Sequence, residues 1–414
     1  MAQPWYDGHS RRGLAICAAL FALVMGVYFA EALHKQTVPF DEPLWFMRAR
    51  VAPTNLSTDQ YRMWAIDTLA LNRWAYGAVL KSTGLDKLPP GEKRAWEARD
   101  GKLYFLGRYL PNDWKLYDPT KPDLYWFEWT HGVYAPRDAI LAMRMADLAA
   151  FGALLVLLWL TARMVLGSDV MAAAAVLPLC MLPNWLTCVA FVLGGGDVFM
   201  LAGVALALYL WTKYHVAGRG ASWTAVIAVG AAAGLATSAK HTGVIAVAAF
   251  GAYLFWQARG WRRVAMPAAA ALAALAVFTV VNPVVLMYPG ARPWQVLDKM
   301  MHWRGYVVSE AVGRVGKAGV SSIWKRDLFW LPYLPVTCAV ALTLRRERWF
   351  APLVLWSGSI VAGVSIGLAR MGYFQDNYDT PVEMALYFPL SLAAMALVAK
   401  HLRAARHGEP SQDR

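Results

Sequence analysis

Two adjacent carboxylates, Asp41 and Glu42, follow the first apolar segment of the chain. Neighbouring anions repel each other, so a metal ion, a cationic side chain or a carboxyl pKa above its ordinary value must compensate. A carboxylate pair placed where an apolar helix would leave a bilayer indicates chemistry at the membrane surface. The alternative is that the pair caps an interfacial helix over residues 44–50, because anions stabilise a helix N-terminus.

The composition predicts a membrane protein with several spans. Hydrophobic residues make up 58% of the 414 and charged residues only 16%, with a mean hydropathy of +0.37. A soluble protein of this size would be less apolar. The net charge is +13, yet residues 34–138 hold 15 Lys/Arg against 13 Asp/Glu, so most of the excess flanks the apolar segments. That distribution argues against nucleic acid as a partner.

Apolar segments of about 17 to 25 residues can cross a hydrocarbon core of about 30 Å. We identify segments of this kind at residues 13–33, 139–162, 170–192, 198–211, 223–239, 242–256, 264–287, 328–344, 350–368 and 381–399. The fourth and sixth are short. We therefore expect an all-α polytopic membrane protein with about ten transmembrane helices, forming a single membrane domain over residues 1–414. The four cysteines fall inside apolar segments, which predicts neither a loop disulfide nor a zinc site.

Lys and Arg predict the orientation of the spans. With the N-terminus in the cytoplasm, every short inner connection is basic, as the positive-inside rule expects. The inner residues are Arg11, Arg12, Arg163, Lys213, Arg219, Arg259, Arg262, Arg263, Arg345, Arg346, Arg348, Lys400, Arg403 and Arg406. Residues 34–138 then form the first extracytoplasmic loop, residues 288–327 the second, and residues 400–414 a cytoplasmic tail. We expect an inner or plasma membrane location, with Asp41 and Glu42 outside.

The first outer loop has its own helical pattern. Residues 58–83 begin with a capping pair and continue with aromatic and aliphatic residues, which predicts an interfacial helix. Its aromatic residues would anchor at headgroup depth or stack on sugar rings. Just before the loop, residues 30–32 imitate a signal-peptidase site, and cleavage there would remove the first span while leaving Asp41 outside.

Several fragments in a fixed order resemble one family. They are residues 40–42, 143–148, 163–167, 196–199, 234–243 and 282–283. Their succession relative to the spans resembles the GT-C membrane glycosyltransferases that use polyprenyl-phosphate sugars, in the branch of the protein O-mannosyltransferases and the lipid A aminoarabinose transferase. The resemblance covers roughly residues 13 to 290. Many members carry His-Pro-Pro or Lys-Pro-Pro in the first loop, whereas residues 71–76 here read Leu-Asn-Arg-Trp-Ala-Tyr.

The resemblance implies a GT-C-like fold and a sugar transfer. An acceptor hydroxyl, on a glycan, glycolipid or protein, would attack the anomeric carbon of a polyprenyl-phosphate sugar at the outer face of the membrane. Asp41 matches the carboxylate that these enzymes place at the reacting centre, so we expect it to be the general base. Glu42 would bind a divalent metal, orient Asp41 or cap a helix.

The resemblance and the charges also indicate a donor site. Lys240 interrupts an apolar stretch, and an ionisable residue at membrane depth is a functional candidate, although a Lys there can also snorkel to water. The expected donor phosphate or sugar ligands are Lys240, His241, Arg370, Arg304 and His131.

A metal site is a further expectation. Asp197 follows three glycines and would meet Asp41 in an oxygen-rich site for magnesium, manganese or calcium, unless it caps the fourth span. No other cofactor is expected.

Two other functions fit parts of the sequence. A secondary transporter would also have many spans, but it would normally show a repeat and charges near the bilayer midplane. A polysaccharide polymerase or ligase would share the outer loop and the outer arginines, with a diphosphate-linked donor. The early Asp41 and Glu42 favour the monophosphate-dependent transferase over the second of these.

The orientation makes a direct prediction. A Lys87→Cys variant should react with an impermeant thiol reagent added to intact cells, whereas Arg346→Cys should not, because Lys and Arg bias short loops to the inner side. Mass tagging of the purified protein after quenching measures both reactions. Labelling at position 346 in intact cells would overturn the topology and the outer active site together.

Overall fold

The computed structural model describes residues 11–34, 45–46, 49, 70–86, 96–99, 102–105, 137–182, 185–186, 189, 197–287, 292–295, 349–371 and 379–407. Within these residues, five helices are long and apolar enough to cross a membrane: Arg11–Leu33, Asp138–Leu166, Asp197–Val216, Arg262–Val281 and Pro381–Leu402. Shorter apolar helices lie between them. The predicted all-α polytopic membrane protein is therefore confirmed.

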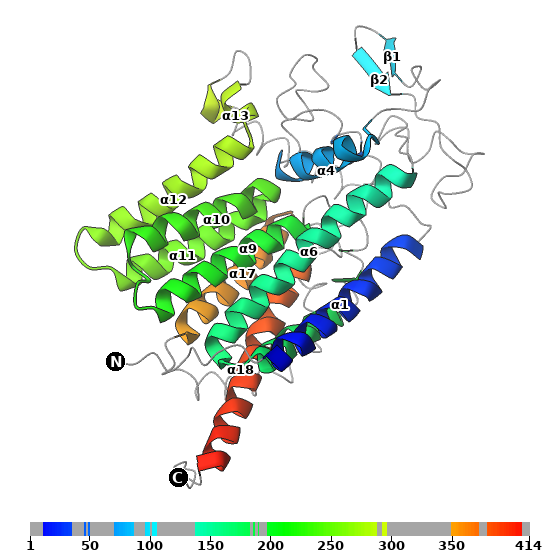
Figure 1. The fold of residues 1–414 in the computed structure, drawn as a ribbon. Coiled ribbons are helices and arrows are strands. Elements are labelled where there is room, and N and C mark those ends of the chain that lie inside the picture. The colour runs from blue at the N-terminus through cyan, green and yellow to red at the C-terminus, as the bar shows by residue number, and fades with distance from the viewer. Residues whose placement is uncertain are drawn as a thin grey trace.

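The helices form a bundle crossed at one end by a short helix (Figure 1). The bundle contains α1 (Arg11–His34), α6 (Arg137–Leu166), α7 (Asp169–Cys180), α9 (Asp197–Val216), α10 (Trp223–Ala239), α11 (Val244–Gln257), α12 (Arg262–Val281), α17 (Phe350–Met371) and α18 (Asp379–His407). The crossing helix is α4 (Ala70–Thr83), and a single turn, α13 (Val284–Met287), follows α12. Predicted spans overlap these bundle helices, except for residues 328–344, which lie outside the described residues.

Two predicted spans have different boundaries in the structure. The third, expected over residues 170–192, ends as a regular helix at Cys180. Pro183 explains the early end, since the residue before a proline disfavours helical backbone angles. The seventh, expected over residues 264–287, stops at Val281, because Asn282 leaves the helical region with φ −111° and ψ 69°. Pro283 then starts the separate turn α13 without a backbone N–H to offer.

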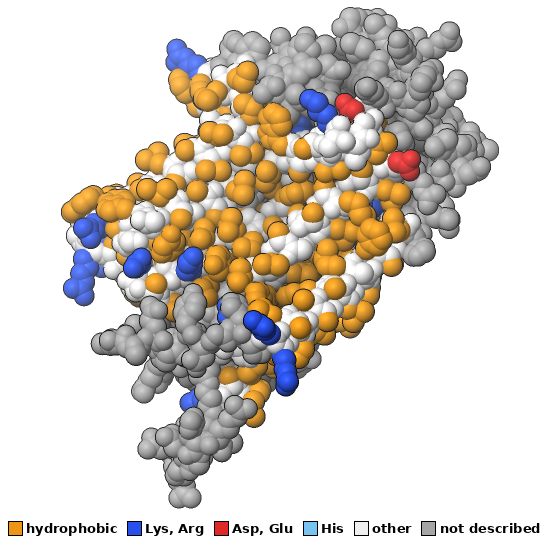
Figure 2. All heavy atoms as spheres, viewed as in Figure 1, with side chains coloured by type: hydrophobic (Ala, Val, Ile, Leu, Met, Phe, Trp, Pro, Cys, Tyr) orange, Lys and Arg blue, Asp and Glu red, His pale blue; other side chains and the backbone are white. Residues whose placement is uncertain are grey.

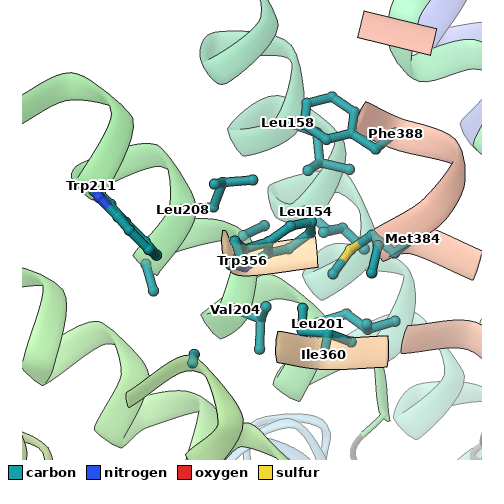
Figure 3. Packing of buried hydrophobic residues seen from close by; sticks show 14 of the residues in the cluster. Leu154, Leu158, Leu201, Val204, Leu208, Trp211, Trp356, Ile360, Met384 and Phe388 are labelled. Atoms are coloured by element: carbon teal, nitrogen blue, oxygen red, sulfur yellow. The ribbon is translucent and has the colours of Figure 1, made fainter. Parts of the chain in front are cut away.

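Figure 3 shows the centre of the bundle, where side chains from four helices meet. The labelled residues are Leu154 and Leu158 of α6, Leu201, Val204, Leu208 and Trp211 of α9, Trp356 and Ile360 of α17, and Met384 and Phe388 of α18. All of them are buried. Lipid tails are as apolar as these side chains, so close packing rather than exclusion from water holds them together.

Small residues let α10 approach its neighbours closely. A Cβ atom at Gly230 would lie 2.5 Å from the backbone oxygen of Ala270 on α12, and one at Gly203 of α9 would lie 2.8 Å from the Cα of Ala236 on α10. Gly234, one helical turn after Gly230, faces Ala274 in the same way. Glycine and alanine four residues apart are the usual means of bringing membrane helices into backbone contact.

A two-stranded hairpin was not predicted. Strand β1 (Trp96–Arg99) pairs antiparallel with β2 (Lys102–Phe105), in a register that sets Arg99 opposite Lys102. The sequence between the strands is Asp100-Gly101, a pair that strongly favours two-residue hairpin turns. That dipeptide was the signal for the hairpin within the first loop.

Lys and Arg gather at one end of the bundle, opposite α4 (Figure 2). This end, called the basic end here, contains the start of α1, the end of α6, the α9–α10 turn and the α11–α12 turn. At the α6–α7 turn, the Nε of Arg163 lies 2.6 Å from an Asp169 carboxylate oxygen. This distribution of Lys and Arg agrees with the positive-inside rule on which the predicted orientation rests. That the basic end faces the cytoplasm stays a prediction.

Because α10 and α12 approach closely, the same Gly→Leu substitution should affect stability differently on α10 and on α1. Gly230→Leu should destabilise the protein, because the new side chain meets the α12 backbone, and overpacking of this kind costs typically about 1 to 3 kcal/mol. Gly26→Leu on α1 should change stability little, since among the described residues no atom apart from the backbone of α1 itself lies within 4 Å of a Cβ at that position. Thermal unfolding of the two purified variants in the same detergent measures the difference, and equal midpoints would contradict the packing described for α10.

Candidate functional site

A buried ion pair joins two helices at the end of the bundle opposite the basic end. The Nζ of Lys240 donates a hydrogen bond to Oδ1 of Asp197. Asp197 is the first residue of α9, and Lys240 is the residue that ends α10. Their exposed fractions are 1% and 5%, so Lys240 does not snorkel to water. Two residues predicted independently as a metal ligand and a phosphate ligand therefore lie in direct contact.

The backbone after α10 places Lys240 for this contact. Lys240 is extended, with φ −152° and ψ 140°, while its N–H still donates to the carbonyl of Ala236. A single 3₁₀ turn, His241–Gly243, follows before α11 begins. The Oγ1 of Thr242 in that turn lies 2.9 Å from the Sδ of Met200 on α9. The turn is thus held against the same helix that carries Asp197.

Helix α4 is hydrogen-bonded to the ends of α10 and α12. The N–H of Ala70 donates to Oδ1 of Asn282 at 2.7 Å, which satisfies one of the donors that a helix N-terminus leaves open. The Nδ2 of Asn72 donates to the carbonyl of Ala239 at 3.1 Å, immediately before Lys240. The Nε1 of Trp74 donates to the carbonyl of Val281 at 3.0 Å. The first turns of α4 therefore lie directly beside the ion pair.

The same helix contacts α6 and α9. The hydroxyl of Tyr76 donates to Oδ1 of Asp147 on α6 at 2.7 Å. The Tyr76 ring is fully buried and makes edge contacts with Trp45 and with Phe199 of α9, at centroid distances of 5.8 and 5.6 Å. One turn earlier on α6, buried Arg144 donates from Nη1 to the carbonyl of Ala32 near the end of α1 at 2.8 Å. Buried polar side chains thus connect α1, α4 and α6 at this end.

The other predicted site residues are placed as follows. His241 lies in the 3₁₀ turn, half-buried, next to Lys240. Arg370 belongs to the end of α17, and its side chain is not among the described ones. Asp41, Glu42, His131 and Arg304 lie outside the described residues. The structure accordingly brings together Asp197, Lys240 and His241, and the roles of all these residues stay predictions.

Several buried polar residues at this end were not among the site residues predicted from the sequence. Arg73 and Tyr76 of α4 come from the segment that departs from the family pattern, so no role was carried over to them. Asp147 lay inside a recognised fragment without an assigned role. Glu383 of α18 is also buried, and it lies within the predicted span over residues 381–399, whereas Lys240 lies between two predicted spans. The criterion that selected Lys240, an ionisable residue in an apolar segment, would have found it.

Of the two predicted metal ligands, Asp197 is among the described residues and Asp41 is not. Among the described residues, no group of three or more His, Cys, Asp or Glu side chains is arranged to hold a metal ion. The Asp197 carboxylate contacts an ammonium group, a neighbour that competes with a divalent cation for the same oxygen. Asp41, its expected partner as a ligand, is not described, so the magnesium, manganese or calcium site stays a prediction.

Part of the chain matches a known protein family. The family model of the dolichyl-phosphate-mannose-protein mannosyltransferases matches residues 132–286. No curated protein and no solved structure matches the chain. The matched segment contains α6 to α12, with Arg144, Asp197 and Lys240. Residues 132–286 are thus similar to this mannosyltransferase family, which confirms the resemblance drawn from the sequence and is consistent with a glycosyltransferase of the GT-C superfamily.

Proposed function

We propose that the protein transfers a sugar, mannose or a related hexose, from a polyprenyl-phosphate donor to a hydroxyl acceptor at the outer face of the membrane. The observation that carries this proposal is the buried pair of Lys240 and Asp197 beneath α4. It lies within the segment that matches the mannosyltransferase family. Similarity to a family of transferases also argues against the secondary transporter that the sequence allowed as an alternative.

Lys240 suits a carrier phosphate for a physical reason. An ammonium group has three N–H donors, so it can contact a carboxylate and a phosphate at the same time. Asp197 compensates the charge of Lys240 before donor binding, since an uncompensated ion at this depth would be strongly unfavourable. When the sugar–phosphate bond breaks, negative charge grows on the phosphate, and a cation already in place stabilises it without rearrangement.

The transfer itself needs a base. The acceptor oxygen forms a bond to the anomeric carbon, the bond from that carbon to the phosphate oxygen breaks, and the electron pair leaves with the polyprenyl phosphate. The hydroxyl proton passes to the carboxylate of Asp41. Asp41 follows α1 in the sequence. The end of α1 lies at the same end of the bundle as Lys240, and the carbonyl of Ala32 there accepts a hydrogen bond from Arg144. Arg144 thereby fixes the end of the helix that precedes the proposed base in the sequence.

The direct test offers purified protein a panel of donors. Polyprenyl-phosphate mannose and other monophosphate-linked sugars should release polyprenyl phosphate in the presence of an acceptor, whereas diphosphate-linked glycans should not. Glycan, glycolipid and peptide acceptors are compared with the donor that works. Release from diphosphate-linked donors alone would instead support a polymerase or ligase.

Removal of the Lys240 charge should impair use of the donor. A single Lys240→Met change takes the ammonium partner away from the buried Asp197 carboxylate, at a cost of about 3 to 5 kcal/mol in stability. The Lys240→Met/Asp197→Asn double variant removes both charges and should recover much of that stability. Its kcat/KM for the donor should still fall roughly ten- to a hundredfold, as expected for the loss of one charge-assisted contact of about 1.5 to 3 kcal/mol.

Two further variants separate the phosphate role from a structural one. Lys240→Arg keeps the charge and should retain part of the kcat/KM for the donor, although a planar guanidinium group replaces the compact ammonium. Lys213→Met removes an exposed Lys at the basic end and should leave the kinetics unchanged. Wild-type donor kcat/KM in a well-folded double variant would restrict the ion pair to a role in stability.

The base role predicts a different pattern for Asp41. Asp41→Asn should nearly abolish transfer while leaving folding and donor binding intact, because it removes the proton acceptor and keeps the shape. General-base assistance is worth on the order of 100- to 10,000-fold in rate. Single-turnover rates at saturating donor measure the loss. More than about a tenth of the wild-type rate would exclude Asp41 from that role.

A further inference from the structure

Aromatic side chains form an exposed surface at the basic end of the bundle. Trp261, just before α12, is 69% exposed, and Trp223, the first residue of α10, is 41% exposed. Their ring centroids lie 6.1 Å apart. This contact joins the turn before α10 to the turn before α12. Trp256 at the end of α11 is 80% exposed and lies beside the same turn in sequence. We call Trp223, Trp256 and Trp261 the indole surface.

Three arginines lie in the α11–α12 turn and at the start of α12. Arg263 donates from Nε to the carbonyl of Ala258 at 3.0 Å, and its guanidinium lies 5.9 Å from the centre of the Phe255 ring, so it is held against the end of α11. Arg259 and Arg262 are exposed. Gly260 between them has φ +57°, in the left-handed region that favours glycine. Both exposed arginines therefore lie within two residues of Trp261 in a tight turn of the backbone.

No acid in this part of the chain balances these cations. The sequence contains no Asp or Glu from residue 198 to residue 297, which includes α10, α11 and α12 together with the turns at their basic ends. The neighbouring α9–α10 turn adds Lys213 and Arg219, both exposed. The positive charge of the surface is thus uncompensated by the helices that form it.

The position of the indole surface selects its partner. Large exposed indoles at the ends of apolar helices favour headgroup depth, where the ring is buried and its N–H stays hydrated. Guanidinium groups at that depth meet lipid phosphates, with which they form paired hydrogen bonds. Uncompensated positive charge then favours a lipid whose headgroup carries a net negative charge over a zwitterionic one.

We propose that the indole surface, with Arg259 and Arg262, is a binding site for the headgroup of an anionic phospholipid in the leaflet at the basic end. The phosphate lies against the two guanidinium groups, and the acyl chains lie along the apolar flanks of α11 and α12. The site is at the opposite end of the bundle from Lys240 and Asp197 and is independent of the sugar transfer.

Native mass spectrometry of the full chain in detergent, titrated with phosphatidylglycerol or phosphatidylcholine, tests this site. Wild type should bind phosphatidylglycerol more tightly. Arg259→Gln/Arg262→Gln should weaken that binding roughly five- to thirtyfold, since each basic residue near the surface contributes about one fivefold step, and should weaken phosphatidylcholine binding less, so that the preference for phosphatidylglycerol falls. Arg263 is retained in this variant because it is bonded to the end of α11.

The matched control is Arg11→Gln/Arg12→Gln, which removes the same charge from exposed residues at the start of α1, on the same end of the bundle. It should keep the wild-type preference. A second test variant, Trp261→Leu, should weaken binding of both lipids, and thermal unfolding confirms that each variant is folded. Unchanged phosphatidylglycerol affinity in the Arg259/Arg262 variant, or an equal loss in the α1 control, would overturn the proposal. Competition by soluble glycerol phosphate at equal concentration would also overturn it, because the site would then bind free anions.

Discussion

The ion pair between Lys240 and Asp197 constrains how the helices meet at the end of the bundle opposite the basic end. A charge buried among apolar helices is tolerated only with its partner in place, so the start of α9 and the end of α10 must keep their relative position. The small residues between those helices allow the required approach. Asn72 then binds the carbonyl just before Lys240, which brings α4 to the same place. The relative positions of α4, α9 and α10 at this end therefore depend on the pairing of these two opposite charges.

The two ends of the bundle differ in how some of their charged side chains are placed. At the end covered by α4, several ionisable side chains are buried and bonded to other protein groups, as Arg144 and Asp147 illustrate, although Lys81 there is exposed. At the basic end, Arg259 and Arg262 are exposed to the surroundings. Buried and oriented charges suit chemistry on a substrate, since their positions are fixed before it arrives. Exposed charges suit a lipid surface. The division supports placing the transfer and the lipid contact at opposite ends.

Apolar length and the order of fragments made the bundle predictable from the sequence, since α10 begins and ends where its apolar segment does. Lys240 was predicted as a ligand because it stands between two closely spaced apolar segments, residues 223–239 and 242–256. Its partnership with Asp197 was not predicted, because the two residues are 43 positions apart and only the packing of α9 on α10 joins them. The position of α4 was equally hidden, since Asn72 and Tyr76 bind residues on distant helices. Local patterns indicate helices, whereas contacts across the bundle depend on the complete fold.

The hydrogen bonds of α4 impose an order on assembly during synthesis. Ala70, Asn72 and Trp74 bind groups that follow them by 212, 167 and 207 residues. At roughly 5 to 20 residues per second, a ribosome takes on the order of 10 to 40 seconds to make that length of chain. Throughout that interval α4 exists without Asn282 to cap it, and an isolated helix of 14 residues is only marginally stable in water. Helix α4, which lies beside the candidate site, is therefore made early but cannot be fixed until α12 and Asn282 have been made.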